Sequence, residues 1–209
     1  MAAVRVVTYN AHYGKMSVPI TTRHEMCARM LLAQRLATST IFMIQEASLT
    51  LYNLLKRAKT HTAYYDPRGA LMAVLTLVPK TLEALEATEA CPKGVMVRIV
   101  PFETSPMRRQ FHAVFLCNSR LALVNTHMES CTDGARARKD QLGEIGRAIK
   151  REGEYRFGVF GDLNWPIKTR ESTTRWLTHI PNTLHEVKQI SAKRDPAISL
   201  HTLNTFTVE

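Results

Sequence analysis

Several patterns that mark well-known classes of protein are missing from this sequence. The four cysteines are scattered and form no Cys-x-x-Cys pair, which argues against a zinc ribbon or a disulfide framework and favours a reducing compartment. No apolar run approaches the roughly 20 residues that a membrane-spanning helix needs. The chain opens without a charged-then-apolar leader, so we expect no secretory signal. These absences predict an intracellular protein with no membrane span.

Acidic residues are scarce relative to basic ones. The 28 lysines and arginines outnumber the 18 aspartates and glutamates, so the formal net charge is +10 and the pI is about 9.7. A basic surface favours polyanions, meaning nucleic acid or anionic lipid headgroups, whereas the plain alternative is solubility alone. The 209 residues are expected to form one domain, 1–209, which is long enough to bury a substantial core.

Four short apolar runs each end in polar or charged residues. The run 4–9 ends at Asn10, the run 41–45 at Glu46, the run 121–126 at His127, and the run 157–160 at the tetrapeptide 161–164. Their apolar and β-branched residues predict strands. Because the carboxyl ends of strands in an α/β fold meet at one edge, where ligands bind, we expect these side chains to lie together.

The tetrapeptide Gly161-Asp162-Leu163-Asn164 is the most informative of the four endings. Asp162 and Asn164 place two oxygen-bearing side chains near one spot at the end of a buried strand. Such oxygens suit a hydrated hard cation or a water that attacks a phosphate. Taken alone, the same pattern is typical of an ordinary turn after a strand. The three other strand endings favour the ligand interpretation.

The rest of the chain predicts a mixture of helices, strands and one hairpin. The helical period and possible capping residues indicate helices, and the apolar runs bounded by turns indicate strands, of which the last two before residue 130 form a hairpin. We expect helices near 22–37, 50–59, 135–151 and 169–179, further strands near 70–78, 95–101 and 111–117, and a polar tail at 203–208. This mixture suggests two packed mixed sheets with helices outside.

In their order, these segments resemble the endonuclease/exonuclease/phosphatase superfamily. Within it, the sequence is most similar to the tyrosyl-DNA phosphodiesterase 2 (TDP2) family, and the likeness runs from residue 4 to the tail. The resemblance implies an α/β (α+β) fold, a four-layer sandwich of two packed mixed β-sheets flanked by helices. The motifs are Thr8-Tyr9-Asn10, Gln45-Glu46, Thr126-His127-Met128-Glu129-Ser130, Gly161-Asp162-Leu163-Asn164, Arg138-Lys139-Asp140-Gln141-Leu142, the segment 99–109, and Arg170-Glu171.

The resemblance also implies a Mg²⁺-dependent phosphodiesterase (Mn²⁺ being the alternative ion) that hydrolyses tyrosyl adducts at DNA ends, in the nucleus or cytoplasm. Glu46 is then the principal metal ligand, with Asn10 and Asp162 beside it. His127 donates to a non-bridging phosphate oxygen, Asp162 orients or deprotonates the attacking water, and Asn164 fixes the phosphate. The alternatives are a solvated Glu46 and a satisfied buried His127.

Residues outside the strand ends are assigned more weakly. By resemblance, Arg138 and Gln141 brace the loop after His127, although a solvated helix surface explains them equally well. Arg138 is also a candidate for binding substrate. Arg109, with its neighbour Arg108, is a candidate for phosphate contacts, although a solvated charge pair is the commoner case. Phe206 is a candidate for stacking on a base, but an aromatic residue in a strand is more often part of the core.

One departure from the superfamily matters. Its members end in a Ser-Asp-His-like strand terminus that supplies a catalytic His and Asp, and this sequence has none. We therefore expect the last strands of the domain to be missing and the activity of this chain alone to be impaired. The alternatives are a general nuclease or lipid-headgroup phosphatase of the same fold, or an inactive relative that binds nucleic acid or protein. The sequence predicts no oligomeric state.

Overall fold

The computed structural model describes residues 4–11, 20–33, 40–67, 73–130, 134–164, 187–194 and 202–208. The helices in these ranges are α1 (Ile20–Ala33), α2 (Leu49–Leu55), α3 (Lys80–Leu85) and α4 (Gly134–Glu152). The strands are β1 (Val4–Asn10), β2 (Thr40–Ala47), β3 (His61–Tyr65), β4 (Ala73–Pro79), β5 (Val95–Pro101), β6 (Gln110–Leu116), β7 (Leu121–His127), β8 (Arg156–Asp162), β9 (Val187–Arg194) and β10 (Thr202–Val208).

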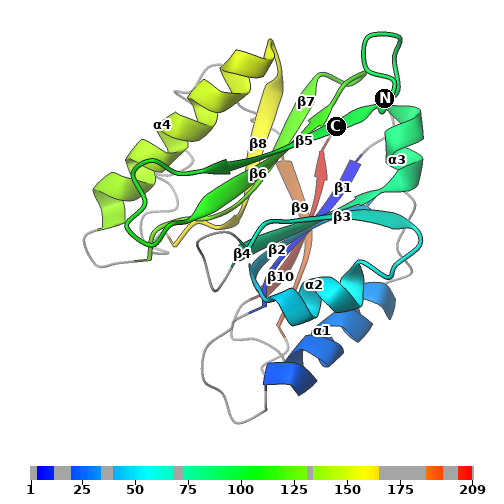
Figure 1. The fold of residues 1–209 in the computed structure, drawn as a ribbon, viewed down its shortest axis with the longest axis vertical. Coiled ribbons are helices and arrows are strands. Elements are labelled where there is room, and N and C mark those ends of the chain that lie inside the picture. Colours follow the sequence, from blue (N-terminus) through cyan, green and yellow to red (C-terminus); the bar gives the residue numbers. More distant parts are fainter. Residues whose placement is uncertain are drawn as a thin grey trace.

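The strands form two mixed sheets that pack face to face (Figure 1). The first sheet has six strands in the order β3-β4-β2-β1-β10-β9, and the second has four in the order β5-β6-β7-β8. Each sheet contains one parallel pair, β1 with β2 and β7 with β8, among antiparallel neighbours. The predicted α+β sandwich of two mixed sheets is therefore confirmed.

Three apolar clusters hold the four layers together. The first joins α1 and α2 to the outer face of the six-stranded sheet, and it includes Leu31, Leu51 and Phe42. The second lies between the two sheets, and the third joins α4 to the outer face of the four-stranded sheet. Because β2, β4, β6 and β7 are buried on both faces, they are apolar almost throughout instead of alternating.

A polar bridge crosses the apolar layer between the sheets. The Gln45 amide in β2 donates to Asn125 Oδ1 in β7 at 2.8 Å. Asn125 in turn donates from Nδ2 to Leu75 O and to Thr76 Oγ1 in β4, both at 3.0 Å. Asn125 is fully buried and Gln45 nearly so. Because hydrogen bonds are directional and apolar contacts are not, this bridge sets the relative position of the two sheets.

Three predictions about the chain's organisation need correction. The segment expected to be a polar tail contains the strand β10, which pairs antiparallel with β1 and with a further strand, β9. The sequence prediction also missed β3 and the short helix α3. A disulfide joins Cys91 to Cys117, although the scattered cysteines had argued against one. The predicted helix at 169–179 lies outside the described residues.

The other elements follow their predicted positions. Helices α2 and α4 and strands β4 to β8 lie within a few residues of the expected ranges, and β6 and β7 form the expected hairpin. Helix α1 begins at Ile20, two residues before the predicted start. In the part of the chain that the structure describes, no helix is long and apolar enough to cross a membrane.

Candidate active site

The two parallel strand pairs bring the four predicted strand endings to one edge of the sandwich. Asn10 ends β1 opposite Gln45 of the neighbouring β2, and His127 ends β7 opposite Asp162 of β8. The polar side chains therefore come from both sheets and meet where the sheets face each other. This confirms that the endings of the four runs lie together, as the apolar runs predicted.

The amide of Asn10 joins the two carboxylates of the site. Its Nδ2 donates to Glu46 Oε1 at 3.0 Å and to Asp162 Oδ2 at 2.9 Å. An amide nitrogen carries two hydrogens, so one Asn side chain can serve both carboxylates at once. Asn10 is buried, whereas the Glu46 and Asp162 side chains remain 13% and 16% exposed. The carboxylates can therefore meet a ligand that the amide cannot reach directly.

His127 lies beside both carboxylates. Its Nε2 is 3.9 Å from Glu46 Oε1 and 3.8 Å from Asp162 Oδ2, and the side chain is 5% exposed. A protonated imidazole at this place would interact with two negative charges at once, and a neutral one could offer its Nε2 as a hydrogen-bond partner. The imidazole of His127 and the amide of Asn10 thus each lie within about 4 Å of both carboxylates.

A bulge in β2 directs Glu46 toward this cluster. Ile44 pairs with Leu75 of β4, but the next pair is Ala47 with Ala73. Between these two pairs, β2 therefore contains one residue more than β4. Glu46 has φ of 52°, in the left-handed region that non-glycine residues seldom occupy. Bulges re-aim side chains in this way and are common next to active sites. The strain at Glu46 is consistent with a functional position.

Gly161 is required where β8 passes β7. Its φ is 119°, and a Cβ atom built there would lie 2.0 Å from the carbonyl oxygen of Thr126 and 3.0 Å from the Gln45 amide. Only glycine fits such an approach of backbone to backbone. The close contact places Asp162 beside His127, and the Met128 backbone N–H confirms the pairing by donating to Asp162 O at 2.9 Å.

Asn164 holds the turn after β8 against the chain that follows His127. Its Nδ2 donates to Met128 O at 2.7 Å, and its backbone N–H donates to Asp162 Oδ1 at 2.9 Å. Asn164 also has a positive φ, 48°, which asparagine tolerates better than most residues. These contacts give it a positioning role, and its predicted contact with a phosphate stays a prediction.

Glu129 is the centre of a second, buried group of contacts behind His127. Its carboxylate accepts from Ser105 Oγ at 2.9 Å and lies 4.0 Å from Arg109 Nε. Its backbone oxygen accepts from Arg138 Nη1 at 2.8 Å, and its backbone N–H donates to Gln141 Oε1 at 3.1 Å. Glu129 is 1% exposed. The bracing of this loop by Arg138 and Gln141, one of the two sequence interpretations, agrees with these contacts.

The same contacts disagree with Arg109 and Arg138 as direct substrate ligands. Both residues are 6% exposed, and their guanidinium groups contact Glu129, Ser130 and Met107 within the protein. A guanidinium turned inward toward a buried carboxylate is badly placed to meet a phosphate from solvent. The neighbouring Arg108 is exposed, as the solvated alternative predicted. Sequence reasoning missed Ser105, whose role no local motif signals.

Phe206 lies away from the strand ends that form the cluster. In β10 it pairs with Val6, four residues before Asn10 along β1, which corresponds to roughly 13 Å at the usual rise of a strand. This register does not support a base stacked on Phe206 beside the carboxylates. His179, His185 and His201, none of which follows an aspartate in the sequence, lie outside the described residues.

The donor set fits a hard divalent cation held partly by water and substrate. Mg²⁺ prefers oxygen ligands and is usually bound by one or two carboxylates together with waters and phosphate oxygens. Glu46 and Asp162 supply two carboxylates that share one amide donor. Among the residues that the structure describes, no three His, Cys, Asp or Glu side chains are grouped as a complete metal site. The arrangement therefore fits an open site and not an all-protein cage.

Comparisons with known proteins identify the fold. No family model matches the sequence, and no curated protein matches it significantly. Among solved structures, TDP2 from Caenorhabditis elegans aligns with 98% of this chain at 18% identity and a TM-score of 0.63. TDP2 from D. rerio, in complex with a single-strand DNA product, aligns with 99% at 15% identity and a TM-score of 0.63. The chain has the endonuclease/exonuclease/phosphatase fold.

A bacterial structure supports the same conclusion. The endonuclease/exonuclease/phosphatase from Bacteroides vulgatus aligns with 100% of this chain at 15% identity, with a TM-score of 0.65. The resemblance inferred from the sequence motifs is thus confirmed for the fold, and TDP2 structures are among those to which it is similar. The chain covers 88% of the bacterial chain and 84% of the D. rerio chain, but only 63% of the C. elegans TDP2 chain.

Proposed function

We propose that this protein is a metal-dependent phosphodiesterase that acts at DNA ends, with release of a tyrosyl adduct from a 5′-phosphate as its specific reaction. The observation that carries the proposal is the Asn10 amide that joins the Glu46 and Asp162 carboxylates. Together with His127, these groups come from four strands and two sheets. Similar structures, among them D. rerio TDP2 in complex with a single-strand DNA product, support the choice of substrate.

The chemistry divides between the two carboxylates. Glu46 and Asp162 would hold Mg²⁺, which supplies charge compensation to the phosphoryl and leaving oxygens when bound. Asp162 also orients a water for in-line attack and accepts its proton at a carboxylate oxygen. Asn10 keeps the two carboxylates at a fixed separation, which pre-organises the site before substrate arrives.

His127 acts on the phosphate itself. The Nε2 atom lies within 4 Å of both carboxylates, so a phosphate placed for attack by a water at Asp162 would also be within reach of the imidazole. An N–H at Nε2 then donates to a non-bridging oxygen and stabilises the charge that develops there. The segment that follows His127 is held in place from two sides. Asn164 binds the Met128 carbonyl oxygen, and the backbone of Glu129 is bound by Arg138 and Gln141.

The test is hydrolysis of a 5′-phosphotyrosyl oligonucleotide by the 209-residue chain with Mg²⁺. We expect tyrosine release that falls at least about 100-fold in Glu46→Gln and in Asp162→Asn, a usual size for the loss of one such group. Glu89→Gln and Glu154→Gln remove exposed carboxylates elsewhere on the surface and serve as matched controls. Binding of Mn²⁺, followed by calorimetry, should weaken in the same two variants and not in the controls.

The substrate panel separates the alternatives. Release of tyrosine without cleavage of an unmodified oligonucleotide supports the specific reaction. Cleavage of both substrates indicates a general nuclease, and hydrolysis of an inositol phosphate headgroup in preference to either indicates the phosphatase. Well-folded protein that hydrolyses none of them would refute the enzymatic proposal for this chain and favour the relative that only binds.

A further inference from the structure

The exposed face of α4 carries a row of positive charge. Arg136, Lys139, Arg147, Lys150 and Arg151 are all exposed on this helix, and their spacing places them on one side of it. We call these five residues the basic stripe. From Arg136 to Lys150 the helix rises by about 21 Å. Helix α4 covers the outer face of the four-stranded sheet and lies at the surface of the molecule (Figure 1).

The opposite face of α4 fixes the direction in which the stripe points. Leu142, Ile145 and Ile149 are buried in the apolar cluster beneath the helix. Glu144 is also turned inward, because its carboxylate accepts the backbone N–H groups of Glu103 at 2.8 Å and Thr104 at 3.2 Å. The helix therefore cannot rotate without breaking these contacts, and the stripe is held toward solvent.

Within α4 itself, the carboxylates are fewer than the cations of the stripe. Helix α4 has three carboxylates. Glu144 accepts hydrogen bonds from the backbone N–H groups of residues 103 and 104, and Glu152 forms an ion pair with Arg98 at 2.9 Å. Only Asp140 lies within the stripe, and it is 4.0 Å from Arg136, whose side chain is 93% exposed. An ordinary solvated helix of this length alternates charges that pair at i and i+4. The stripe instead has five cations and one carboxylate.

Lys150 and Arg151 stand in the last turn, where cations complement the helix dipole, but the rest of this charge pattern does not serve the helix. Arg136 stands in the first turn, which contains no acidic residue, although the positive end of the helix dipole favours acidic side chains there. Arg147 has like-charged neighbours three and four residues later, at Lys150 and Arg151, a spacing that destabilises isolated helices. Gly143 leaves room for the Arg147 guanidinium, which would lie 3.3 Å from a Cβ atom at that position. A ligand of opposite charge explains this arrangement better than helix stability does.

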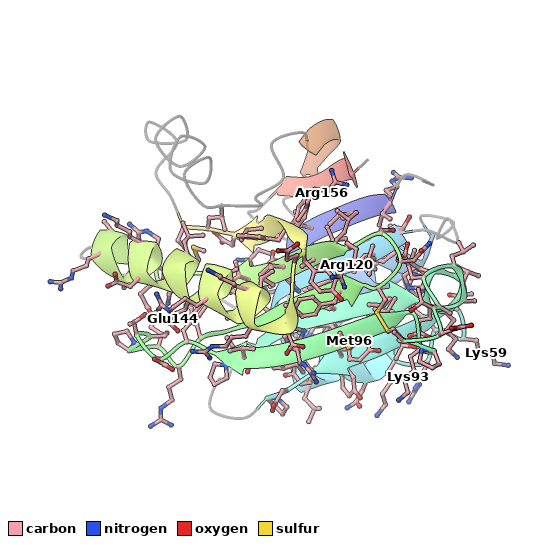
Figure 2. The ribbon with its side chains drawn as sticks, turned by 90° about the horizontal axis from the view of Figure 1, so that it is seen from above. Lys59, Lys93, Met96, Arg120, Glu144 and Arg156 are labelled. Carbon is pink, nitrogen blue, oxygen red and sulfur yellow. A yellow bond between two sulfur atoms is a disulfide. The ribbon has the colours of Figure 1, made fainter. Side chains whose placement is uncertain are left out.

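The stripe begins beside the candidate active site. Gly134, the first residue of α4, packs against the backbone oxygen of Glu129, 3.3 Å from where its Cβ would be, and Arg138 donates to the same oxygen. Glu129 follows His127 by two residues, so the first turn of α4 borders the loop on which His127 depends. At the other end of the helix, the exposed Arg120 and Arg156 add positive charge (Figure 2). A chain that leaves the site across this loop therefore meets Arg136 and Lys139 near the start of the helix and Arg147, Lys150 and Arg151 near its end.

We propose that the basic stripe binds the phosphodiester backbone of a single DNA strand whose end occupies the candidate active site. This inference rests on the proposed function, because it assigns the path of that substrate. A strand carries one negative charge per phosphate, and lysine and arginine contacts to phosphates dominate such binding without reading the sequence. One row of cations fits one strand. The surface thus adds affinity for long strands and none for small substrates.

The test measures binding of a 3′-labelled, 20-nucleotide single strand by fluorescence anisotropy, in EDTA, at several salt concentrations. The variant Arg136→Gln/Arg147→Gln/Lys150→Gln/Arg151→Gln removes four charges from the stripe. Each phosphate contact on a single strand contributes about 0.7 to the slope of log K against log salt. We expect the slope to decrease in magnitude by about 3, so that raising the salt from 50 to 200 mM weakens the wild type about 50-fold more than the variant.

The matched control removes the same charge elsewhere. Arg57, Lys59, Lys80 and Lys93 are exposed, and Figure 2 shows Lys59 and Lys93 at the far side of the molecule from α4. The four Gln substitutions there should leave the slope near that of the wild type. Equal slopes in the two variants would overturn the proposal. If the fourfold stripe variant does not fold, Arg147→Gln/Lys150→Gln against Lys59→Gln/Lys93→Gln gives the same comparison, with an expected change of about 1.4.

Two further measurements separate this inference from the proposed function. Hydrolysis of thymidine 5′-p-nitrophenyl phosphate, which is too small to reach the stripe, should be equal in wild type and stripe variant. Activity on this substrate with an unchanged slope refutes the stripe alone, whereas a changed slope without any hydrolysis refutes the proposed function alone. A larger loss of binding to phosphatidylserine vesicles than to the strand, or a slope change seen only with duplex DNA, would also refute the single-strand assignment.

Discussion

Replacing Asn125 by leucine tests whether the polar bridge between the sheets stabilises the fold. The substitution removes three buried hydrogen bonds, from Gln45 and to Leu75 O and Thr76 Oγ1, at 2.8 to 3.0 Å. Each contributes about 1 kcal/mol net. The partners keep other contacts, since Gln45 also donates to Met43 O and Thr76 contacts His112. The better burial of leucine offsets part of the loss, so we expect Asn125→Leu to lower the free energy of unfolding by about 2–3 kcal/mol.

Urea unfolding followed by circular dichroism measures this loss, which corresponds to a fall in Tm of about 5–10 °C for a domain of this size. A double-mutant cycle with Gln45→Leu identifies the cause. Two leucines facing each other leave fewer unpaired polar groups than one leucine facing an amide. The double variant should therefore be less destabilised than the sum of the two single variants, by about 1–2 kcal/mol. A loss below 1 kcal/mol in Asn125→Leu, or a coupling energy near zero, would refute the reasoning.

Two further predictions concern stability. The Cys91–Cys117 disulfide closes a loop of 26 residues. Its removal in Cys91→Ala/Cys117→Ala should therefore lower the free energy of unfolding by about 3.5 kcal/mol. Equal urea midpoints of the wild type with and without reductant would contradict this. Burial lowers the pKa of His112 to about 3. Below about pH 6.5 the imidazole is protonated in the unfolded state but stays neutral in the folded state. The free energy of unfolding that His112 contributes is therefore fully present above that pH. It is lost as the pH falls toward 3, by up to about 1.4 kcal/mol per pH unit. As the pH falls from 7 to 4, the urea midpoint of the wild type should therefore fall further than that of His112→Met, whereas parallel pH profiles of the two would show that His112 does not contribute.

The sequence could predict the strand endings because each one breaks a long apolar run. Asn10, Glu46, His127 and Asp162 all come at the ends of largely buried segments, and polar residues in such places need partners. The alternation of apolar and polar residues that usually identifies a strand was not needed to predict these four. The resemblance to a known superfamily then supplied the order of the motifs, which periodicity alone could not have assigned to one edge of the sandwich.

Other features have no local signal. The contact of Ser105 and Arg109 with Glu129 joins residues 20 or more positions apart, and nothing in the segment 99–109 distinguishes an inward arginine from a solvated one. The Cys91–Cys117 disulfide has no characteristic spacing. Strand β9 was missed because it is rich in lysine and polar residues, and its register shift at β10 interrupts the period of two.

The geometry of the site depends on contacts that lie beneath it. The core between the sheets consists mainly of aliphatic side chains, whose packing tolerates small shifts of one sheet over the other. A site made from both sheets needs its groups placed to within about 0.5 Å. The Gln45–Asn125 bridge lies one residue before Glu46 and two before His127, so its directional hydrogen bonds transmit the register of the sheets to both residues. If this reasoning is right, Asn125→Leu should impair hydrolysis even at temperatures where the variant is fully folded.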